Sequence, residues 1–242
     1  MRNLTIFAAV VLALTAAAFA AETAETVVAK NLAARGGVEA LQKITSIKAS
    51  GKNVLPGGNQ VPLLLLQEQA GKFRLESDFN GHTTTMGSDG KQAWRSSAIG
   101  GASPMDPSQA LAIQLQTDFD GVLVDYNERG YQLELVGDQE LGSKVVYHLK
   151  LTHPELADLD VYIDADNFLD VSVTANTMMG DTPWQVSSFF ADYRELGGVK
   201  LPYAIQVRTA DRIAADIRID NIEVNVPLAD SLFAMPAADK EK

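Results

Sequence analysis

The chain has 242 residues, no cysteine and a formal net charge of −11 at pH 7. The absence of cysteine excludes disulfides, thiolate nucleophiles and cysteine-based metal sites. The acidic balance makes nucleic acid and anionic lipid head groups poor candidates for partners. Because no disulfide can form, stability must come from buried apolar surface, and a chain of this length can bury one sizeable core.

The first residues have the pattern of a secretory signal peptide. Arg2 supplies the positive start, residues 6–18 form an apolar stretch, and Ala18-Phe19-Ala20 is an A-x-A cleavage site. The apolar stretch is short for a membrane span. We therefore expect cleavage after Ala20 and export to the periplasm, with no integral membrane segment left in the mature protein. No cysteine follows the stretch, which excludes lipid attachment through an N-terminal cysteine.

Two short helices are expected next. Residues 24–35 place Val28 and Leu32 on one face, and Gly36-Gly37 supplies the C-terminal stop. Residues 38–43 predict one further short helical segment.

Strand patterns dominate the rest of the chain. In residues 72–79 the apolar Phe73, Leu75 and Phe79 alternate with charged residues. Further alternating runs lie at 131–135, 145–151, 159–163, 169–173 and 184–193. Hairpin turns are expected at Gly81, at Gly87 and at residues 89–90.

The last hairpin indicates a strongly curved sheet. Residues 199–208 alternate with period two, as in a strand with one face in a core. In the following strand the apolar residues occupy odd-numbered positions up to Ile219 and even-numbered positions from Ile222. Such a switch from one face of the strand to the other predicts a bulge near Asp220-Asn221. A curved sheet with an apolar concave face favours a container over a catalyst.

One segment interrupts the strands. Residues 98–107 are rich in Gly, Ser and Pro and predict a loop. Asp106 then caps a helix expected over residues 110–118. This helix is either an ordinary cover for the sheet or a movable lid over a cavity, and the sequence leaves both open.

No catalytic residue, cofactor or metal site is expected. His82, His148 and His153 are not spaced as metal ligands, and the chain has no nucleotide-binding or hydrolase motif. The aspartates of residues 158–166 lack the Gly and Glu of a calcium-binding loop, which favours a role in turns. An enzyme would need a pocket with a strongly shifted titratable group, and no pair of acids stands out.

The apolar signals are stronger. Residues 61–66 are apolar at both parities, which predicts a strand covered on both faces. One cover could be the N-terminal helix and the other a ligand cavity, and plain burial on both sides remains the alternative. Methionine suits sites that accept varied acyl chains, because it is flexible and polarizable. The candidate cavity residues, chosen by parity and bulk, are Leu64, Leu66, Phe73, Leu75, Trp94, Leu111, Leu115, Phe119, Met178, Trp184 and Phe189.

Five segments of the chain form a recognisable set. They are the helix ending in Gly36-Gly37, Gly71-Lys-Phe-Arg-Leu-Glu76, Asp89-Gly-Lys-Gln-Ala-Trp94, Tyr162-Ile-Asp164, and the ending that runs from Gly197-Gly-Val-Lys-Leu-Pro202 to Leu232-Phe-Ala-Met-Pro236. Together these segments resemble the periplasmic lipoprotein-carrier superfamily, the outer-membrane lipoprotein-sorting (LolA/LolB-like) proteins.

The resemblance implies a mainly β fold, an unclosed and strongly curved antiparallel β-barrel of about eleven strands. The N-terminal and inserted helices would cover its concave face, in one domain over residues 21–236. Members of this superfamily bind acyl chains inside the barrel and use no cofactor. The dedicated lipoprotein carrier has an Arg-Pro pair where this chain has Gln69 and Ala70, so the role of that arginine in latching the lid does not carry over.

Three functions remain open: two are non-catalytic, and the third, an enzyme, has no residues in the sequence that point to it. The first is a periplasmic carrier or sensor for an acylated or otherwise hydrophobic ligand, a lipid or the acyl chains of a lipoprotein, in outer-membrane lipid or lipoprotein trafficking. The alternative is a module that docks a partner protein of the envelope, such as a protease or a stress-signalling factor. Residues 237–242 are expected to form a disordered tail.

Overall fold

In the computed structural model, the strands form one antiparallel sheet. The structure describes residues 22–98, 100–106, 120–179, 181–209 and 212–237. Across these residues thirteen strands pair in the order β6-β5-β4-β3-β2-β1-β13-β12-β11-β10-β9-β8-β7. The first strand thus pairs with the last in the middle of the sheet, and β6 and β7 form its two edges. The predicted signal peptide, the helix predicted over 110–118 and residues 238–242 of the predicted tail lie outside the described residues.

Among the residues that the structure describes, two α-helices and one 3₁₀ helix accompany the sheet. The helices are α1 (Ala24–Ala34), α2 (Val38–Gln42) and η1 (Asp230–Leu232). The strands are β1 (Ser46–Val54), β2 (Gln60–Glu68), β3 (Lys72–Phe79), β4 (His82–Asp89), β5 (Ala93–Ser97), β6 (Gly101–Pro104), β7 (Gln132–Leu141), β8 (Lys144–Thr152), β9 (Asp158–Asp164), β10 (Asp170–Met179), β11 (Thr182–Leu196), β12 (Val199–Thr209) and β13 (Arg212–Val224). Within the described ranges, no helix has both the length and the apolar character needed to cross a bilayer.

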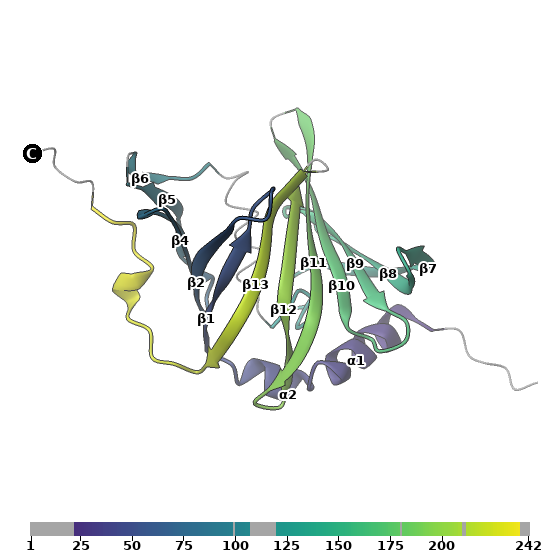
Figure 1. Cartoon of the computed structure of the whole chain (residues 1–242). Helices are drawn as coiled ribbons and strands as arrows, with labels where there is room; N and C mark the ends of the chain where they lie inside the picture. Colours follow the sequence, from purple (N-terminus) through teal and green to yellow (C-terminus); the bar gives the residue numbers. More distant parts are fainter. Residues whose placement is uncertain (1–21, 99, 107–119, 180, 210–211, 238–242) are drawn as a thin grey trace, which may run out of the picture.

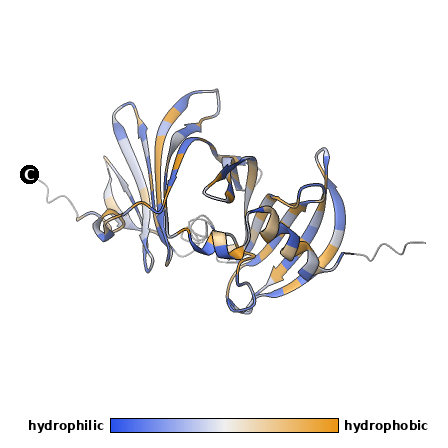
Figure 2. Ribbon diagram, turned by 90° about the horizontal axis from the view of Figure 1, so that it is seen from below, coloured by the Kyte–Doolittle hydropathy of each residue, from blue (hydrophilic) through white to orange (hydrophobic). Residues whose placement is uncertain are grey.

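The fold class predicted from the sequence is confirmed. The protein is mainly β, and its antiparallel sheet is curved and unclosed. The sheet has thirteen strands in the described residues, more than the eleven or so that the resemblance implied. The two α-helices lie across one end of the sheet (Figure 1). Seen from that end, the sheet bends round them, and apolar and polar residues alternate along its strands (Figure 2). This alternation separates a concave face from an outer face.

The core divides into two clusters. The first joins α2 with β1, β2, β3, β12 and β13. The second joins α1 with β8, β9 and β10. Leu32 of α1 packs against both clusters, so this helix bridges the two halves of the concave face.

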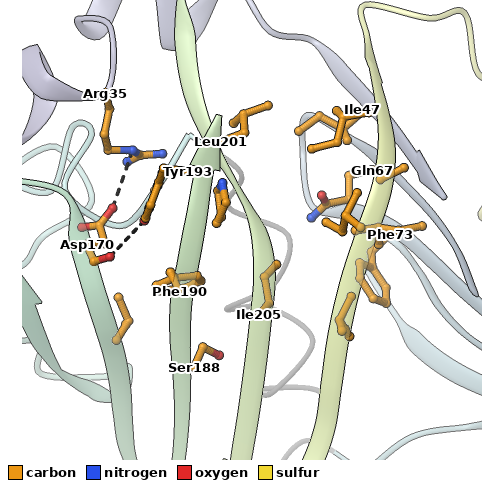
Figure 3. Close-up of a pocket in the computed structure, with 18 of the residues that line it drawn as sticks. Arg35, Ile47, Gln67, Phe73, Asp170, Ser188, Phe190, Tyr193, Leu201 and Ile205 are labelled. Carbon is orange, nitrogen blue, oxygen red and sulfur yellow. Dashed lines mark hydrogen bonds and ion pairs between the residues drawn. The ribbon is translucent and has the colours of Figure 1, made fainter. Parts of the chain in front are cut away.

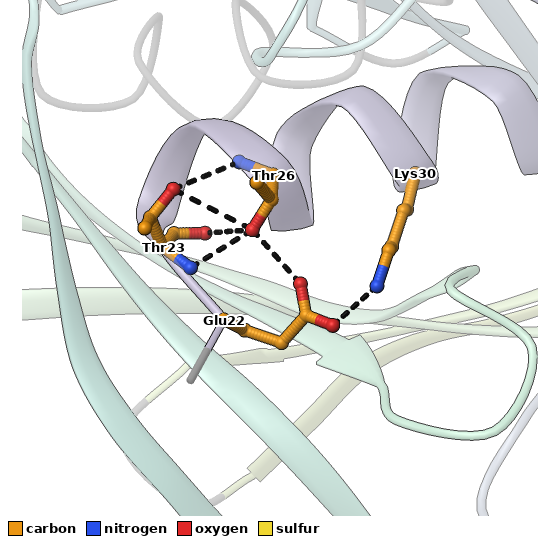
Figure 4. A network of polar contacts seen from close by, with 4 residues as sticks. All are labelled: Glu22, Thr23, Thr26 and Lys30. Atoms are coloured by element: carbon orange, nitrogen blue, oxygen red, sulfur yellow. Dashed lines mark hydrogen bonds and ion pairs between the residues drawn. The ribbon is translucent and has the colours of Figure 1, made fainter. Parts of the chain in front are cut away.

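A compact set of polar contacts fixes the start of α1 (Figure 4). Thr23 is the N-cap, and its hydroxyl accepts a hydrogen bond from the backbone N–H of Thr26 at 3.3 Å. The Thr26 hydroxyl in turn accepts from the Thr23 N–H at 2.8 Å. Glu22 accepts from the Thr26 hydroxyl and forms an ion pair with Lys30. These contacts satisfy N–H groups that the first turn would otherwise leave unpaired.

The end of α1 docks on the turn between β11 and β12. Gly37 N–H donates to the carbonyl of Leu32 at 2.8 Å, which closes the helix. Lys200 N–H donates to the carbonyl of Arg35 at 2.9 Å. A Cβ atom on Gly36 would lie 2.2 Å from the carbonyl oxygen of Gly198, so glycine alone permits this approach. The two Gly-Gly pairs singled out in the sequence therefore meet at one contact between helix and sheet.

The predicted bulge in the last strand is confirmed. Ser50 of β1 pairs with Asn221 and the next residue, Gly51, pairs with Ile219, which leaves Asp220 as the extra residue. A Cβ atom on Gly51 would lie 2.1 Å from the carbonyl oxygen of Arg218. A bulge bends its strand and increases the local twist. This one lies at the centre of the sheet, where the curvature brings the two core clusters to face each other.

Two local predictions were wrong. Gly87, predicted as a hairpin turn, lies inside β4, because the ring of Trp94 packs on it: a Cβ atom there would lie 2.5 Å from the indole carbon Cζ2. The loop predicted over residues 98–107 contains the edge strand β6, which pairs with β5. Edge strands are short and tolerate Gly and Pro, so the composition of this segment concealed a strand.

The C-terminal segment crosses the outer face of the sheet. The backbone carbonyl of Phe233 accepts from the Trp94 indole N–H at 2.8 Å, and that of Leu232 accepts from Arg74 at 2.7 Å. Asp230 pairs with Lys72 at 2.7 Å. Both aromatic side chains are buried, Phe233 completely. The segment therefore covers apolar surface on the side of β3, β4 and β5 that faces away from the helices.

We expect Phe233→Ala to lower the free energy of unfolding by about 3 kcal/mol, because it deletes a fully buried aromatic side chain. Urea unfolding measures this change. Met235→Ala is the matched control in the same segment, where the side chain is 40% exposed. It should shift stability by no more than about 0.5 kcal/mol. Equal effects of the two substitutions would contradict the packing of this segment on the sheet.

Candidate functional site

An apolar cavity lies on the concave face between the two core clusters. The empty space that its lining bounds is about 1230 Å³, including space open to solvent. Figure 3 shows part of the lining, contributed by strands on both sides and by the end of α1. The described residues that line it are Arg35, Ile47, Ala49, Leu63, Leu65, Gln67, Phe73, Leu75, Gly121, Val122, Leu123, Asp170, Val173, Ser188, Phe190, Tyr193, Leu201, Pro202, Ile205, Ile217, Ile219 and Ile222.

Cross-strand rows explain which side chains reach the cavity. Directly paired residues of neighbouring strands point to the same face of a sheet. Ala49 pairs with Leu65, and Leu65 pairs with Leu75, so one apolar row runs across β1, β2 and β3 into the cavity. The next row, of Ile47, Gln67 and Phe73, lies nearer the helices. Strand register alone therefore produces the apolar wall.

Of the candidate cavity residues, Phe73 and Leu75 lie in the lining. Leu64 and Leu66 do not; their neighbours Leu63 and Leu65 do. Successive side chains of a strand point to opposite faces. The predicted residues therefore lie on the outer face of β2, and the cavity borders the other face. The strand was predicted to be covered on both faces, and in the structure Leu66 on the outer face is buried while Leu64 is half-buried. Which face borders the cavity could not be read from a run in which every position is apolar.

Trp94 lies with Leu66 on the outer face. Leu66 pairs with Arg74, Arg74 with Gly87, and Gly87 with Trp94, which places all four on one cross-strand row. The guanidinium of Arg74 lies 5.7 Å from the centroid of the Trp94 ring. Trp94 is thus buried beneath the C-terminal segment and is not part of the cavity.

The remaining candidates lie elsewhere. Phe189 has the outer-face parity of β11, between the lining residues Ser188 and Phe190, and the guanidinium of Arg208 lies 4.8 Å from its ring centroid. Met178 is exposed, and Trp184 lies near the β10–β11 turn, away from the lining. The other three candidates, Leu111, Leu115 and Phe119, lie outside the described residues.

Sequence reasoning missed one wall of the cavity. Val122, Leu123 and Val124 are buried in the turn-rich segment that precedes β7, and the first two line the cavity. A short apolar run outside any periodic element resembles an ordinary loop. The signal that could have found it is the run itself, because three consecutive apolar residues are unusual in a solvated turn.

Arg35, Asp170 and Tyr193 form a polar group at one end of the lining (Figure 3). Arg35 follows the last turn of α1, and its Nε lies 3.6 Å from a carboxylate oxygen of Asp170. Its Nη1 donates to the carbonyl of Asp120 at 2.7 Å. The Tyr193 hydroxyl donates to the backbone carbonyl of Asp170 at 3.1 Å, and Asn31 Nδ2 donates to the Asp170 carboxylate at 3.2 Å.

Burial dominates the electrostatics of this group. Burial raises the pKa of Asp170, while the charge of Arg35 and the hydrogen bond from Asn31 act in the opposite direction. Burial also raises the pKa of Tyr193 well above its usual value, and the nearby carboxylate of Asp170 adds to that increase. The Tyr193 hydroxyl is therefore neutral at physiological pH, and the ionised carboxylate depends on its arginine partner.

The acidic turn singled out in the sequence has a structural role. The Asp164 carboxylate accepts the backbone N–H of Asp166 at 2.9 Å and forms an ion pair with Lys144. This is the turn chemistry that the sequence favoured. Over the described part of the chain, no group of three or more metal-ligating side chains comes together.

Comparison with known proteins shows the fold. No protein-family model matches the sequence, and no curated protein does. Among solved structures, a LolA superfamily protein from Nitrosomonas europaea is 14% identical, with a TM-score of 0.54 over 88% of this chain and 98% of its own. A DUF1329 family protein from Desulfovibrio piger is 12% identical, with a TM-score of 0.54 over 87% and 97%.

A third structure is a domain from Vibrio parahaemolyticus described as an outer membrane lipoprotein-sorting protein. It is 10% identical, with a TM-score of 0.52 over 86% of this chain and 94% of its own. This chain has the LolA-like fold. The resemblance that the sequence indicated is thereby confirmed at the level of the fold.

Proposed function

We propose that this protein is exported to the periplasm and there binds the acyl chains of a lipid or lipoprotein inside the half-barrel, as a non-catalytic carrier or sensor. The observation that carries the proposal is the apolar cavity between the two core clusters. The fold it shares with a lipoprotein-sorting domain supports a role in outer-membrane lipid or lipoprotein trafficking.

The driving force for binding is burial of hydrocarbon. Each CH₂ group transferred from water into the cavity contributes about 0.8 kcal/mol before the entropy of ordering the ligand is subtracted. Apart from the polar group around Arg35, the lining is mostly side chains of Leu, Ile, Val and Phe. Ligand pockets of this kind combine an apolar wall with a few placed polar groups.

Polar contacts and buried apolar side chains together hold the segment that closes the cavity. Arg35 donates to the carbonyl of Asp120, and Gln42 donates to Asp125 at 2.9 Å. Val122, Leu123 and Val124 of the same segment are buried against the two core clusters. Entry of a ligand by separation of this segment from the helices therefore exposes these three side chains.

Native mass spectrometry of the protein purified from an envelope fraction, followed by organic extraction, tests this function. We expect a stoichiometric phospholipid, fatty-acyl ester or acylated peptide. A clean ligand-free mass, together with no uptake of a neutral polarity-sensitive dye, would contradict the proposal. That result would instead favour the alternative in which the protein docks a partner of the envelope.

A further inference from the structure

Building on the proposed function, we infer that Asp170 makes the cavity selective for ligands whose buried part is uncharged. Acyl chains held by ester or amide bonds, as in a diacylglycerol group or an acylated peptide, fit this requirement. A free fatty acid whose carboxylate enters beside Asp170 does not. Asp170 is thus assigned as a specificity-determining residue.

The charged side chains of the lining support this assignment. Among the described lining residues, Arg35 is the one basic side chain and Asp170 the one carboxyl side chain, and the two form an ion pair. They lie next to each other, and their side chains are 6% and 13% exposed. The charges of the pair sum to zero, so the cavity offers no net positive charge to balance an incoming anion.

The guanidinium is also held in place. Its Nε faces Asp170 and its Nη1 donates to the carbonyl of Asp120. The chain at Gly121 passes directly over it: a Cβ atom there would lie 2.3 Å from Nη1. Arg35 therefore cannot turn to a new anion without giving up contacts that anchor the segment covering the cavity.

A ligand carboxylate would meet a high electrostatic cost in this position. Either two negative charges would share one buried site beside a single guanidinium, or Asp170 would have to take up a proton. Like charges in one site strongly disfavour ionisation of both, and an uncompensated buried charge costs several kcal/mol. Burial raises the pKa of Asp170, while Arg35 and Asn31 lower it, so the first carboxylate already depends on these two partners.

An ester or amide avoids this cost. Its carbonyl is uncharged, and Ser188 and Tyr193 place hydroxyl groups in the lining. Any apolar cavity prefers an ester to an ionised acid to some extent, because the carboxylate must lose water. The diagnostic quantity is therefore the change in that preference when the Asp170 charge is removed.

The experiment compares a long-chain fatty acid with its methyl ester, at a pH where the acid is ionised. Displacement of a neutral polarity-sensitive dye gives the two dissociation constants and their ratio. The native protein should bind the ester more tightly. In Asp170→Asn the isosteric amide removes the negative charge beside Arg35, and the ratio should shift toward the acid by at least about tenfold.

Two further variants separate charge from structure. Asp170→Glu keeps a negative charge beside Arg35, so the ratio should stay near the native value. Arg35→Gln combined with Asp170→Asn removes both charges, and the preference for the ester should return. If Asp170→Asn does not fold, equal or tighter binding of the acid by the native protein still overturns the inference.

The outcomes also distinguish the inference from the function on which it rests. Binding of both ligands with no shift in Asp170→Asn would overturn the role of Asp170 while leaving a carrier intact. Binding of neither ligand by the folded native protein would overturn both.

Discussion

Replacing Leu65 with glutamate should abolish ligand uptake. Leu65 lies in the wall of the cavity, at the centre of the apolar row from Ala49 to Leu75. A carboxylate there would be buried against hydrocarbon whenever an acyl chain enters, at a cost of several kcal/mol. We expect binding of a neutral fluorescent acyl ester to weaken by at least about a hundredfold in a fluorescence titration.

Leu64→Glu is the matched control. Leu64 is the adjacent residue of the same strand, is likewise half-buried and points to the opposite face. A glutamate there would lie opposite Glu76, a like-charge pair that lowers stability by up to about 1 kcal/mol but leaves the wall of the cavity unchanged. Uptake should therefore be close to native. Circular dichroism and urea unfolding establish that both variants fold, and equal loss of uptake in both would place the ligand elsewhere.

Gly36→Ala should destabilise the protein by about 4 kcal/mol or more, the largest effect on stability that we expect from a single methyl group. The φ angle of Gly36 is +119°, which strains any other residue. The added Cβ would also lie 2.2 Å from the backbone oxygen of Gly198 and 2.9 Å from the Cα of Val199. Backbone atoms cannot rotate away as a side chain does, so the end of α1 would have to move away from the β11–β12 turn.

Gly37→Ala separates strain from contact. Gly37 also has a positive φ, +90°, but a Cβ there meets no atom within 4 Å. The free energy of unfolding of this variant should fall only by the strain of the backbone, about 1–3 kcal/mol. Urea unfolding of the two variants gives the difference between their stabilities. That difference measures the contribution of the close approach of Gly36 to Gly198. Similar losses for the two variants would show that α1 does not dock on the β11–β12 turn.

Much of the sheet could be predicted from the sequence. Period-two alternation located β3 and β12, and the phase switch in β13 located the bulge at Asp220. Gly36-Gly37 indicated the end of the first helix, and Gly197-Gly198 belonged to one of the segments that carry the family resemblance. That they touch could not be foreseen, because local patterns do not report which distant turns meet.

The cavity was harder to predict for a physical reason. Parity identifies the buried face of a strand only when polar residues occupy the other face. In β2 both faces are apolar, since Leu65 faces the cavity and Leu66 shares the outer face with Trp94. Bulk was equally misleading, because Trp94 fills the space beneath Phe233 and not the cavity.

The polar group of the cavity gave no sequence signal at all. Arg35 ends a helix and Asp170 begins a strand, which are common positions for charged residues. Only the fold brings them together across the chain. Their significance comes from shared burial, which no local pattern can show.

The central claim is that hydrocarbon occupies the space between the two core clusters. The most direct test is a crystal structure of the protein with a methyl ester whose acyl chain carries bromine, located by its anomalous scattering. We predict a bromine peak between Leu65 and Phe73 on one side and Val122 and Val173 on the other. A peak confined to the outer face, or an empty cavity at saturating ester, would contradict the account.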